Sequence, residues 1–186
     1  MINYWVTSDT HYSHTNIIKY CDRPFPDATT MNACMVTRYN AVVRPGDVVW
    51  HLGDVTFFWK GWETLVKNLH GTRHLILGNH DREKKLKPYF ASIQTRKLLI
   101  VDGIRLYMSH RPCLDRVSSF QLHGHRHSKP DAILNRRLGT LDVGVDGHEF
   151  RPWALDEITT LVRRTVAEIE TEDRHLHTLA GNIKFT

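Results

Sequence analysis

The sequence predicts a mixed α/β sandwich, and two features of its apolar pattern support this prediction. In the first half, apolar runs at residues 2–7, 48–52 and 74–77 alternate with segments of helical periodicity, as in parallel strands joined by helices. In the second half, apolar runs flank Asp102 and Gly103, a dipeptide that favours a tight hairpin turn. Alternation followed by a hairpin-rich half favours a mixed arrangement over a purely parallel sheet.

The elements expected in the first half follow from apolar spacing and from turn residues. We expect a strand over 2–7, one short helical turn within 12–20 and a helix over about 30–43, which the segment 44–47 ends. A strand over 48–52 follows. Apolar side chains at helical spacing over 62–69 predict another helix that ends near Gly71, and residues 74–77 form the third strand.

In the second half, the basic run over 82–87 predicts a short solvated helix, and 97–101 and 104–108 form the arms of the hairpin. Residues 119–122 predict a short strand, 128–137 a polar loop and 138–145 another strand. A last helix is expected over about 155–172, whereas the tail over 175–186 has no clear pattern. Because the chain shows neither a repeat nor a linker, we expect residues 1–186 to form a single domain.

The composition is that of a soluble globular protein. The 186 residues are 41% hydrophobic and 24% charged, and no apolar run is long enough to span a bilayer. The N-terminal residues lack the pattern of a secretory signal and the three cysteines lack metal-ligand spacing, so we expect reduced thiols and a cytoplasmic location. The net charge of +5 favours an anionic partner, but the basic residues are too scattered to indicate nucleic acid by themselves.

Polar side chains that can perform chemistry gather at the predicted strand ends. Five motifs follow apolar runs: Asp9-Thr10-His11, Gly53-Asp54, Gly78-Asn79-His80-Asp81, Ser109-His110 and Gly124-His125-Arg126-His127. Because residues just past the carboxyl ends of strands meet at one edge of an α/β sheet, we expect these side chains to converge. A single histidine in a loop would mean little, but chance is a poor explanation for five such motifs together.

The residue types predict a pair of metal ions. Carboxylate and amide oxygens mixed with imidazoles suit divalent first-row transition metals, and the lack of thiolates argues against a structural zinc site. The candidate ligands, too many for one ion, are Asp9, His11, Asp54, Asn79, His110, His125 and His127. Asp54 is the only carboxylate at its strand end and is therefore the natural bridge between two ions, which would hold a hydroxide for in-line attack on a phosphoryl group.

His80 and Asp81 have a different predicted role. His80 directly follows Asn79, and adjacent side chains point apart, so His80 is not expected to bind the same ion. We expect it instead to donate a hydrogen bond or a proton to the phosphoryl or leaving oxygen. Asp81 would orient the other ring nitrogen of His80, which makes both residues candidate catalytic residues.

The five motifs, in this order and spacing over residues 5–146, resemble the signature of the calcineurin-like binuclear metallophosphoesterases. The resemblance implies the αββα fold, a two-sheet sandwich flanked by helices. It implies metals such as manganese, iron, nickel or zinc, of which we expect manganese. It also implies one ion on Asp9, His11 and His127, a second on Asn79, His110 and His125, and Asp54 bridging them. The segments 9–18, 23–25 and 145–148 further resemble a small bacterial and phage subgroup.

Three side chains near the motifs are candidate substrate-binding residues. His14 and Arg23 follow the first ligand pair in a loop that could overhang the metals, and Arg111 follows His110. Either arginine would grip a phosphate oxygen through its guanidinium group. Helix capping and loop bracing explain these residues equally well.

The motifs favour a metal-dependent hydrolase of phosphate esters, with phosphodiesters preferred because a small chain suggests an open site. One alternative is a nuclease acting on single-stranded or end-exposed nucleic acid. Another is a phosphodiesterase for a cyclic nucleotide or dinucleotide, with Tyr12, His14 and Arg23 lining a compact pocket. A third alternative is not an enzyme: a non-catalytic scaffold would keep the metals for structure. Such a scaffold has no use for a positioned acid such as His80.

Overall fold

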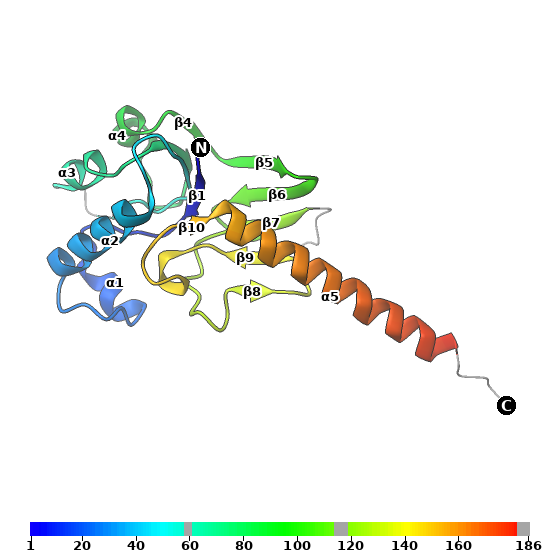
Figure 1. Cartoon of the computed structure of the whole chain (residues 1–186). Helices are drawn as coiled ribbons and strands as arrows, with labels where there is room; N and C mark the ends of the chain where they lie inside the picture. The colour runs from blue at the N-terminus through cyan, green and yellow to red at the C-terminus, as the bar shows by residue number, and fades with distance from the viewer. Residues whose placement is uncertain (58–60, 114–118, 182–186) are drawn as a thin grey trace.

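The computed structural model describes residues 1–57, 61–113 and 119–181, with side chains as far as Thr171, and Figure 1 shows their arrangement. Over these residues the strands form two five-stranded sheets. Helices flank the two sheets, which confirms the predicted α/β sandwich.

The first sheet contains the parallel strands that the first half of the sequence predicts. Its order is β10-β1-β2-β3-β4, in which β1 to β4 are parallel and β10 pairs antiparallel with β1. The strands are β1 Tyr4–Thr7, β2 Val48–His51, β3 Thr72–Ile76, β4 Ser92–Gln94 and β10 Trp153–Ala154. Because β1, β2 and β3 are parallel, the residues that follow them lie at one edge of the sheet.

The second sheet has the order β5-β6-β7-β9-β8 and contains the predicted hairpin. Its strands are β5 Arg96–Val101, β6 Ile104–Ser109, β7 Phe120–His123, β8 Leu134–Asn135 and β9 Thr140–Asp142. The turn between β5 and β6 has positive φ angles at Asp102 and Gly103, +47° and +80°, as the dipeptide predicts. Because β6, β7 and β9 are parallel, they also direct their following residues to one edge.

The short helices lie on the outer side of the first sheet (Figure 1). They are α1 Thr15–Tyr20, α2 Ala28–Val42, α3 Trp62–Lys67 and α4 Glu83–Leu86, and one-turn 3-10 helices cover Lys87–Tyr89 and Val145–Gly147. The Asp27 carboxylate accepts the N–H of Thr30 at 2.7 Å and so caps α2. Met31, Met35 and Tyr39 then face the sheet, one or two helical turns apart.

The buried side chains form two cores. One lies between the first sheet and its helices and includes Met31, Leu75 and Leu86. The other lies between the two sheets and includes Leu52, just after β2, and Leu106 of β6. A site at the common edge of the sheets is therefore held by packed layers on both sides.

The C-terminal helix is longer than the sequence pattern predicts. Helix α5 extends over Leu155–Gly181, so most of the tail that shows no pattern is helical, and its far half projects away from the sheets (Figure 1). Leu155, Ile158 and Val162 anchor the near half in the core between the sheets. Residues 156–180 contain neither Gly nor Pro, so the helical hydrogen bonds continue beyond the last packed turn.

The short solvated helix expected in the basic run is present as α4, whose charged side chains are exposed and whose Leu86 is buried. Two smaller expectations differ from the structure. The strand expected over 138–145 is only Thr140–Asp142, since the chain turns into a 3-10 helix at Val145. The loop over 128–137 contains the two-residue strand β8. Within the described residues, no helix is long and apolar enough to cross a membrane.

Candidate metal centre

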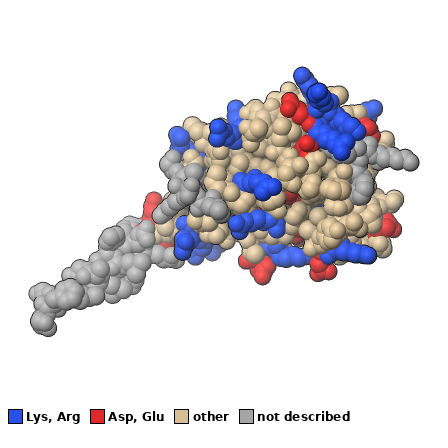
Figure 2. All heavy atoms as spheres, turned by 180° about the vertical axis from the view of Figure 1, so that it is seen from behind, with Lys and Arg blue, Asp and Glu red and all other residues tan. Residues whose placement is uncertain are grey.

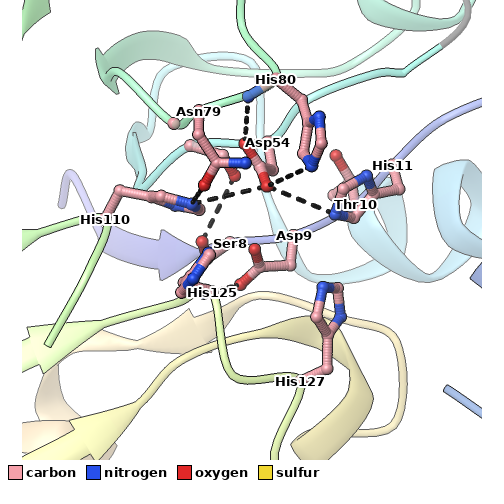
Figure 3. Close-up of polar contacts among 12 residues, drawn as sticks. Ser8, Asp9, Thr10, His11, Asp54, Asn79, His80, His110, His125 and His127 are labelled. Atoms are coloured by element: carbon pink, nitrogen blue, oxygen red, sulfur yellow. Dashed lines mark hydrogen bonds and ion pairs between the residues drawn. The ribbon is translucent and has the colours of Figure 1, made fainter. Parts of the chain in front are cut away.

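The strand ends bring all seven candidate metal ligands to one region between the two sheets (Figure 3). In the first sheet, Asp9, Asp54 and Asn79 follow the parallel strands β1, β2 and β3. In the second sheet, His110 follows β6, and His125 and His127 follow β7. The convergence that the sequence predicts thus comes from residues that follow parallel strands of both sheets.

Five of these seven residues have a left-handed backbone conformation. Their φ angles are +57° at Asp9, +48° at His11, +57° at Asp54, +70° at His125 and +51° at His127. Such a conformation costs a residue with a Cβ roughly 1–2 kcal/mol. Strained residues persist only when the surrounding structure holds them, and their concentration in one cluster is typical of a functional site.

Two motif glycines let the backbone approach the carboxylates closely. A Cβ atom at Gly78 would overlap the Oδ1 atom of Asp54, and a Cβ at Gly124 would overlap the Oδ2 atom of Asp9. Any side chain at either position would therefore push a carboxylate out of place. This explains why glycine begins both the third and the fifth motif.

The backbone that passes the two carboxylates also binds one oxygen of each. The N–H of His80 donates to Asp54 Oδ1 at 3.0 Å, and the N–H of His125 donates to Asp9 Oδ2 at 2.9 Å. Each carboxylate is thereby oriented, with its other oxygen left for the site.

Asp9, His11 and His127 form a first group with the geometry of a metal site, because one ligand atom from each lies within 4.8 Å of the others. Among the described residues, Asp9 Oδ1 and both ring nitrogens of His11 are buried without a hydrogen-bond partner. Buried polar atoms without partners are costly. A bound cation would satisfy Asp9 Oδ1 and one of the His11 nitrogens.

Asp54, His110 and His125 form a second such group. The Nδ1 atom of His110 donates to the carbonyl oxygen of Leu52 at 2.8 Å, which leaves the Nε2 lone pair facing the site. This Nε2 atom lies 3.0 Å from Asn79 Oδ1 and 3.4 Å from Asp54 Oδ2. Three electron-pair donors that converge in this way fit a cation, and nitrogen mixed with oxygen suits a transition metal.

Burial and neighbouring charges shift the pKa values of three side chains in the site. Burial raises the pKa of Asp9 from 3.8 to about 7, although His127 and His110 oppose it. Burial lowers the pKa of His127, but hydrogen bonds with Asp146 and Cys21 and the charge of Asp9 outweigh burial and raise it to about 10. Burial also lowers the pKa of His11 to about 2, so this ring stays neutral and keeps its lone pair for a metal.

The predicted pairing of His80 with Asp81 is wrong. Both Asp81 oxygens accept backbone N–H groups instead, from Asp54 and Gly78 at 2.9 and 2.8 Å on one oxygen and from Val55 at 2.9 Å on the other. Asp81 therefore braces the turn that presents Asp54. The reason is that these turns leave buried N–H groups that need an acceptor.

The His80 side chain lies at the rim of the site, as its predicted role requires. Its side chain is 38% exposed, and its Nε2 atom lies 3.9 Å from Asp54 Oδ2. The ring packs edge-on against Phe57 and His11, with centroid distances of 5.0 and 5.5 Å. Aromatic packing, and not Asp81, sets the orientation of this imidazole.

The prediction that Arg23 grips the substrate is also wrong. Arg23 is buried, and its Nε and Nη2 atoms each donate to a carboxylate oxygen of Asp146 at 2.8 Å. The remaining N–H groups donate to the carbonyl oxygens of Asp9 and Thr10 and to the sulfur of Met31. Arg23 thus braces the first motif, because a buried guanidinium group must have its donors paired.

Asp146 is a site residue that the sequence analysis missed. It accepts a hydrogen bond from His127 Nδ1 at 2.8 Å, so His127 presents its Nε2 atom to the site. The segment 145–148 appeared only as part of the subgroup resemblance, with no role attached. Its function depends on contacts with residues 19 and 123 positions away.

The other two candidate substrate-binding residues lie next to the site. His14 lines the cavity above the ligands, where its ring stacks on Phe57 with a centroid distance of 4.3 Å. Arg111 is exposed, and its Nη2 atom donates to Asn79 Oδ1 at 3.3 Å. Both positions are compatible with contact to a substrate.

Comparison with known proteins identifies the family. Residues 2–177 match the family model described as calcineurin-like phosphoesterase. The chain belongs to this family. Calcineurin-like phosphoesterases are metal-dependent and act on phosphate esters, in agreement with the groups of potential metal ligands described above. The resemblance seen in the motifs is thereby confirmed.

Relatives of this calcineurin-like phosphoesterase span most of its length. It is 31% identical over 169 residues to an uncharacterised protein of Methanocaldococcus jannaschii, covering 86% of this chain and 91% of that protein. It is 32% identical over 203 residues to the gene 66 protein of Mycobacterium phage L5, covering 87% of this chain and 95% of that protein. A solved structure of a protein of unknown function from Aquifex aeolicus matches with a TM-score of 0.72 and 26% identity, covering 87% of this chain and 100% of the other.

Proposed function

We propose that this protein is a binuclear metal-dependent hydrolase of phosphate esters that favours phosphodiesters. One observation carries the proposal: Asp54 Oδ2 lies between the two groups of potential ligands, 3.5 Å from His11 Nε2 and 3.4 Å from His110 Nε2. A carboxylate oxygen with an imidazole of each group on either side is suited to bridge two ions.

The proposed ligands follow the two groups. Asp9, His11 and His127 hold one divalent ion, Asn79, His110 and His125 hold the other, and Asp54 is shared. Manganese is the first candidate, with iron, nickel or zinc as alternatives that nitrogen and oxygen ligands also accept. When bound, the ions supply Lewis acidity and an activated water for attack at phosphorus.

The residues around the proposed ions handle the ester. His80 is exposed at the rim and donates its ring N–H to the leaving oxygen as that oxygen gains negative charge. Arg111, on the Asn79 side, binds a non-bridging phosphate oxygen. His14 confines the substituent on the opposite side of the site.

A preference for diesters is supported by the shape of the cavity. The cavity above the ligands has a volume of about 290 Å³ and extends past the metal groups to Asn16, Ile17 and Tyr20 on α1. A phosphate monoester needs space for one substituent only. The additional space near α1 would take the second substituent of a diester.

The experiment that tests the proposal compares two model substrates. Metal-stripped protein is supplied in turn with manganese, nickel, zinc or magnesium, and hydrolysis of bis-p-nitrophenyl phosphate and p-nitrophenyl phosphate is measured. We expect metal-dependent cleavage with the diester preferred, which Asp54→Asn abolishes and the exposed control Asp131→Asn retains. Metal-bound protein that cleaves neither ester would overturn the enzyme proposal and favour a scaffold. A preference for the monoester would overturn the diesterase part alone.

Nucleic acid is a less well supported substrate. On the face shown in Figure 2, Lys and Arg side chains are dispersed among uncharged and acidic residues and form no continuous track. A nucleic-acid groove normally follows a strand of phosphates with a row of positive charges.

The three cysteines are free, in keeping with a reducing compartment such as the cytoplasm.

A further inference from the structure

One side of the cavity above the metal ligands is aromatic. Tyr20, at the end of α1, and Phe57, just after β2, line the cavity together with His14. We call these three residues the aromatic wall. The potential ligands His125 and His127 line the same cavity, so the wall borders the place where a phosphate ester would bind.

Two rings of the aromatic wall, those of Tyr20 and Phe57, are exposed although they are large, whereas the third, His14, is buried. Tyr20 is 74% exposed and Phe57 is 38% exposed, whereas Tyr12, which the sequence suggested as a pocket residue, is 1% exposed and belongs to the core. Aromatic rings that serve only for packing are buried, as Tyr12 is. Exposed rings beside a catalytic cavity indicate a surface that a ligand covers.

The wall is also held in a defined orientation. The Phe57 ring stacks on His14 with an interplanar angle of 14°, and the Tyr20 ring meets His14 edge-on at 6.2 Å. The Phe57 ring also contacts the His80 ring edge-on at 5.0 Å. Ring contacts of this kind fix the aromatic surface before a ligand arrives, which reduces the ordering cost of binding.

We propose that the aromatic wall binds a flat heteroaromatic ring of the substrate, so that the natural substrate is a phosphate ester bearing a nucleobase. This inference rests on the proposed function, because the ligand groups place the phosphate. A base stacks on an aromatic side chain through its π-face, without needing a specific pattern of hydrogen bonds.

The size of the cavity agrees with a ring connected to the phosphate through a sugar. A volume of about 290 Å³ suits a ligand of nucleotide size and is too small for an oligonucleotide to lie inside. The wall and the His80 side chain meet at Phe57, so the ring would bind beside the proton donor. A free nucleotide ester and the terminal nucleotide of a strand both carry a base connected to a phosphate ester, so either could bind in this way.

Binding of two matched ligands tests the inference directly. AMP and ribose 5-phosphate share the sugar and the phosphate, and only AMP carries a base. Isothermal titration of manganese-loaded protein should show AMP binding about tenfold more tightly, a gain typical of one stacked base. Phe57→Leu and Tyr20→Leu should each reduce the AMP advantage severalfold. Tyr4→Leu, which alters an exposed tyrosine on the opposite end of β1, is the matched control and should retain the advantage.

The outcomes separate this inference from the proposed function. Equal affinities for AMP and ribose 5-phosphate, or an AMP advantage that survives both wall substitutions, would overturn the inference even if the protein hydrolyses diesters. Loss of all ester hydrolysis would overturn the proposed function, whereas the AMP advantage would still be measurable. Adding a ten-residue oligoadenylate distinguishes the sources: tighter, salt-dependent binding of the oligomer assigns the terminal nucleotide of a strand, and binding no tighter than AMP assigns a free nucleotide.

Discussion

Arg23 and Asp146 lie 123 residues apart in the chain and form a two-pronged ion pair, with two N–O distances of 2.8 Å. The pair connects two ligands of the same proposed ion, Asp9 and His127, which follow strands of different sheets. Arg23 holds the backbone of Asp9 in the first sheet, and Asp146 orients His127 from the second sheet. The spacing between Asp9 and His127 therefore depends on a contact that does not itself touch the substrate.

We expect Asp146→Asn and Arg23→Lys to weaken binding of the ion held by Asp9, His11 and His127. The loss of an oriented partner of a ligating histidine typically costs 10- to 100-fold in metal affinity. A lysine cannot restore a two-pronged contact. Metal content should be measured after dialysis against a graded chelator series, with Asp131→Asn as the surface control. Retention equal to that of the unaltered protein would contradict a positioning role.

His80→Ala should lower turnover while leaving the metals and the fold intact. The ring is partly exposed and contributes little to the core, so we expect an unchanged melting temperature. Loss of a positioned proton donor typically lowers the rate by about 10²- to 10⁴-fold. Steady-state kinetics on a diester and metal analysis of the same sample check this. Unaltered kcat in His80→Ala would exclude His80 as the donor.

Asp81→Ala should destabilise the protein, in contrast to His80→Ala. Three backbone N–H groups lose their acceptor, and we expect a decrease of roughly 3 kcal/mol in the free energy of unfolding. Asp81→Asn keeps one acceptor oxygen, so its free energy of unfolding should lie between those of the unaltered protein and Asp81→Ala. Urea unfolding of the metal-free proteins measures the effect. If Asp81 acted only through His80, the stability would stay constant and only turnover would fall.

Asp47 provides a test of pH dependence away from the metal site. Its carboxylate accepts the N–H groups of Asn3 and Arg44 and the indole N–H of Trp5, each at 3.0 Å. Burial raises the pKa of Asp47, but these hydrogen bonds outweigh burial and lower it to about 2. Because this value lies below the ordinary 3.8, the ionised form favours the folded state, and this stabilisation is lost as the pH falls from about 4 towards 2.

The difference in unfolding free energy between the unaltered protein and Asp47→Ala should follow that window. We expect a difference of about 1–3 kcal/mol at pH 7 from the lost hydrogen bonds. The difference should decrease below about pH 4, because the carboxylate takes up a proton in the unfolded state before it does so in the folded state. Urea unfolding at several pH values between 3 and 7 measures it. A constant difference across this range would show that ionisation of Asp47 does not contribute.

Much of the fold and the candidate site could be predicted because the signals are local. The parallel strands appear as apolar runs, and the motif residues immediately follow them, so Asp54 and Asn79 converge once the strands pair in parallel. The hairpin at Asp102 and Gly103 depends on two adjacent residues with positive φ. The family could be inferred for the same reason, since its signature consists of short segments in a set order.

The sequence by itself determined the strand ends, the residue types at the site and hence the metal chemistry. Only the tertiary structure decided how the neighbouring charges are used: Arg23 braces the first motif, Asp81 holds the turn at Asp54, and Asp146 orients His127. It also decided that Tyr20 is exposed at the cavity while Tyr12 is buried. The physical reason is that a side chain's partner is set by which buried donors and acceptors the packed layers bring within reach, and these contacts join residues far apart in the chain.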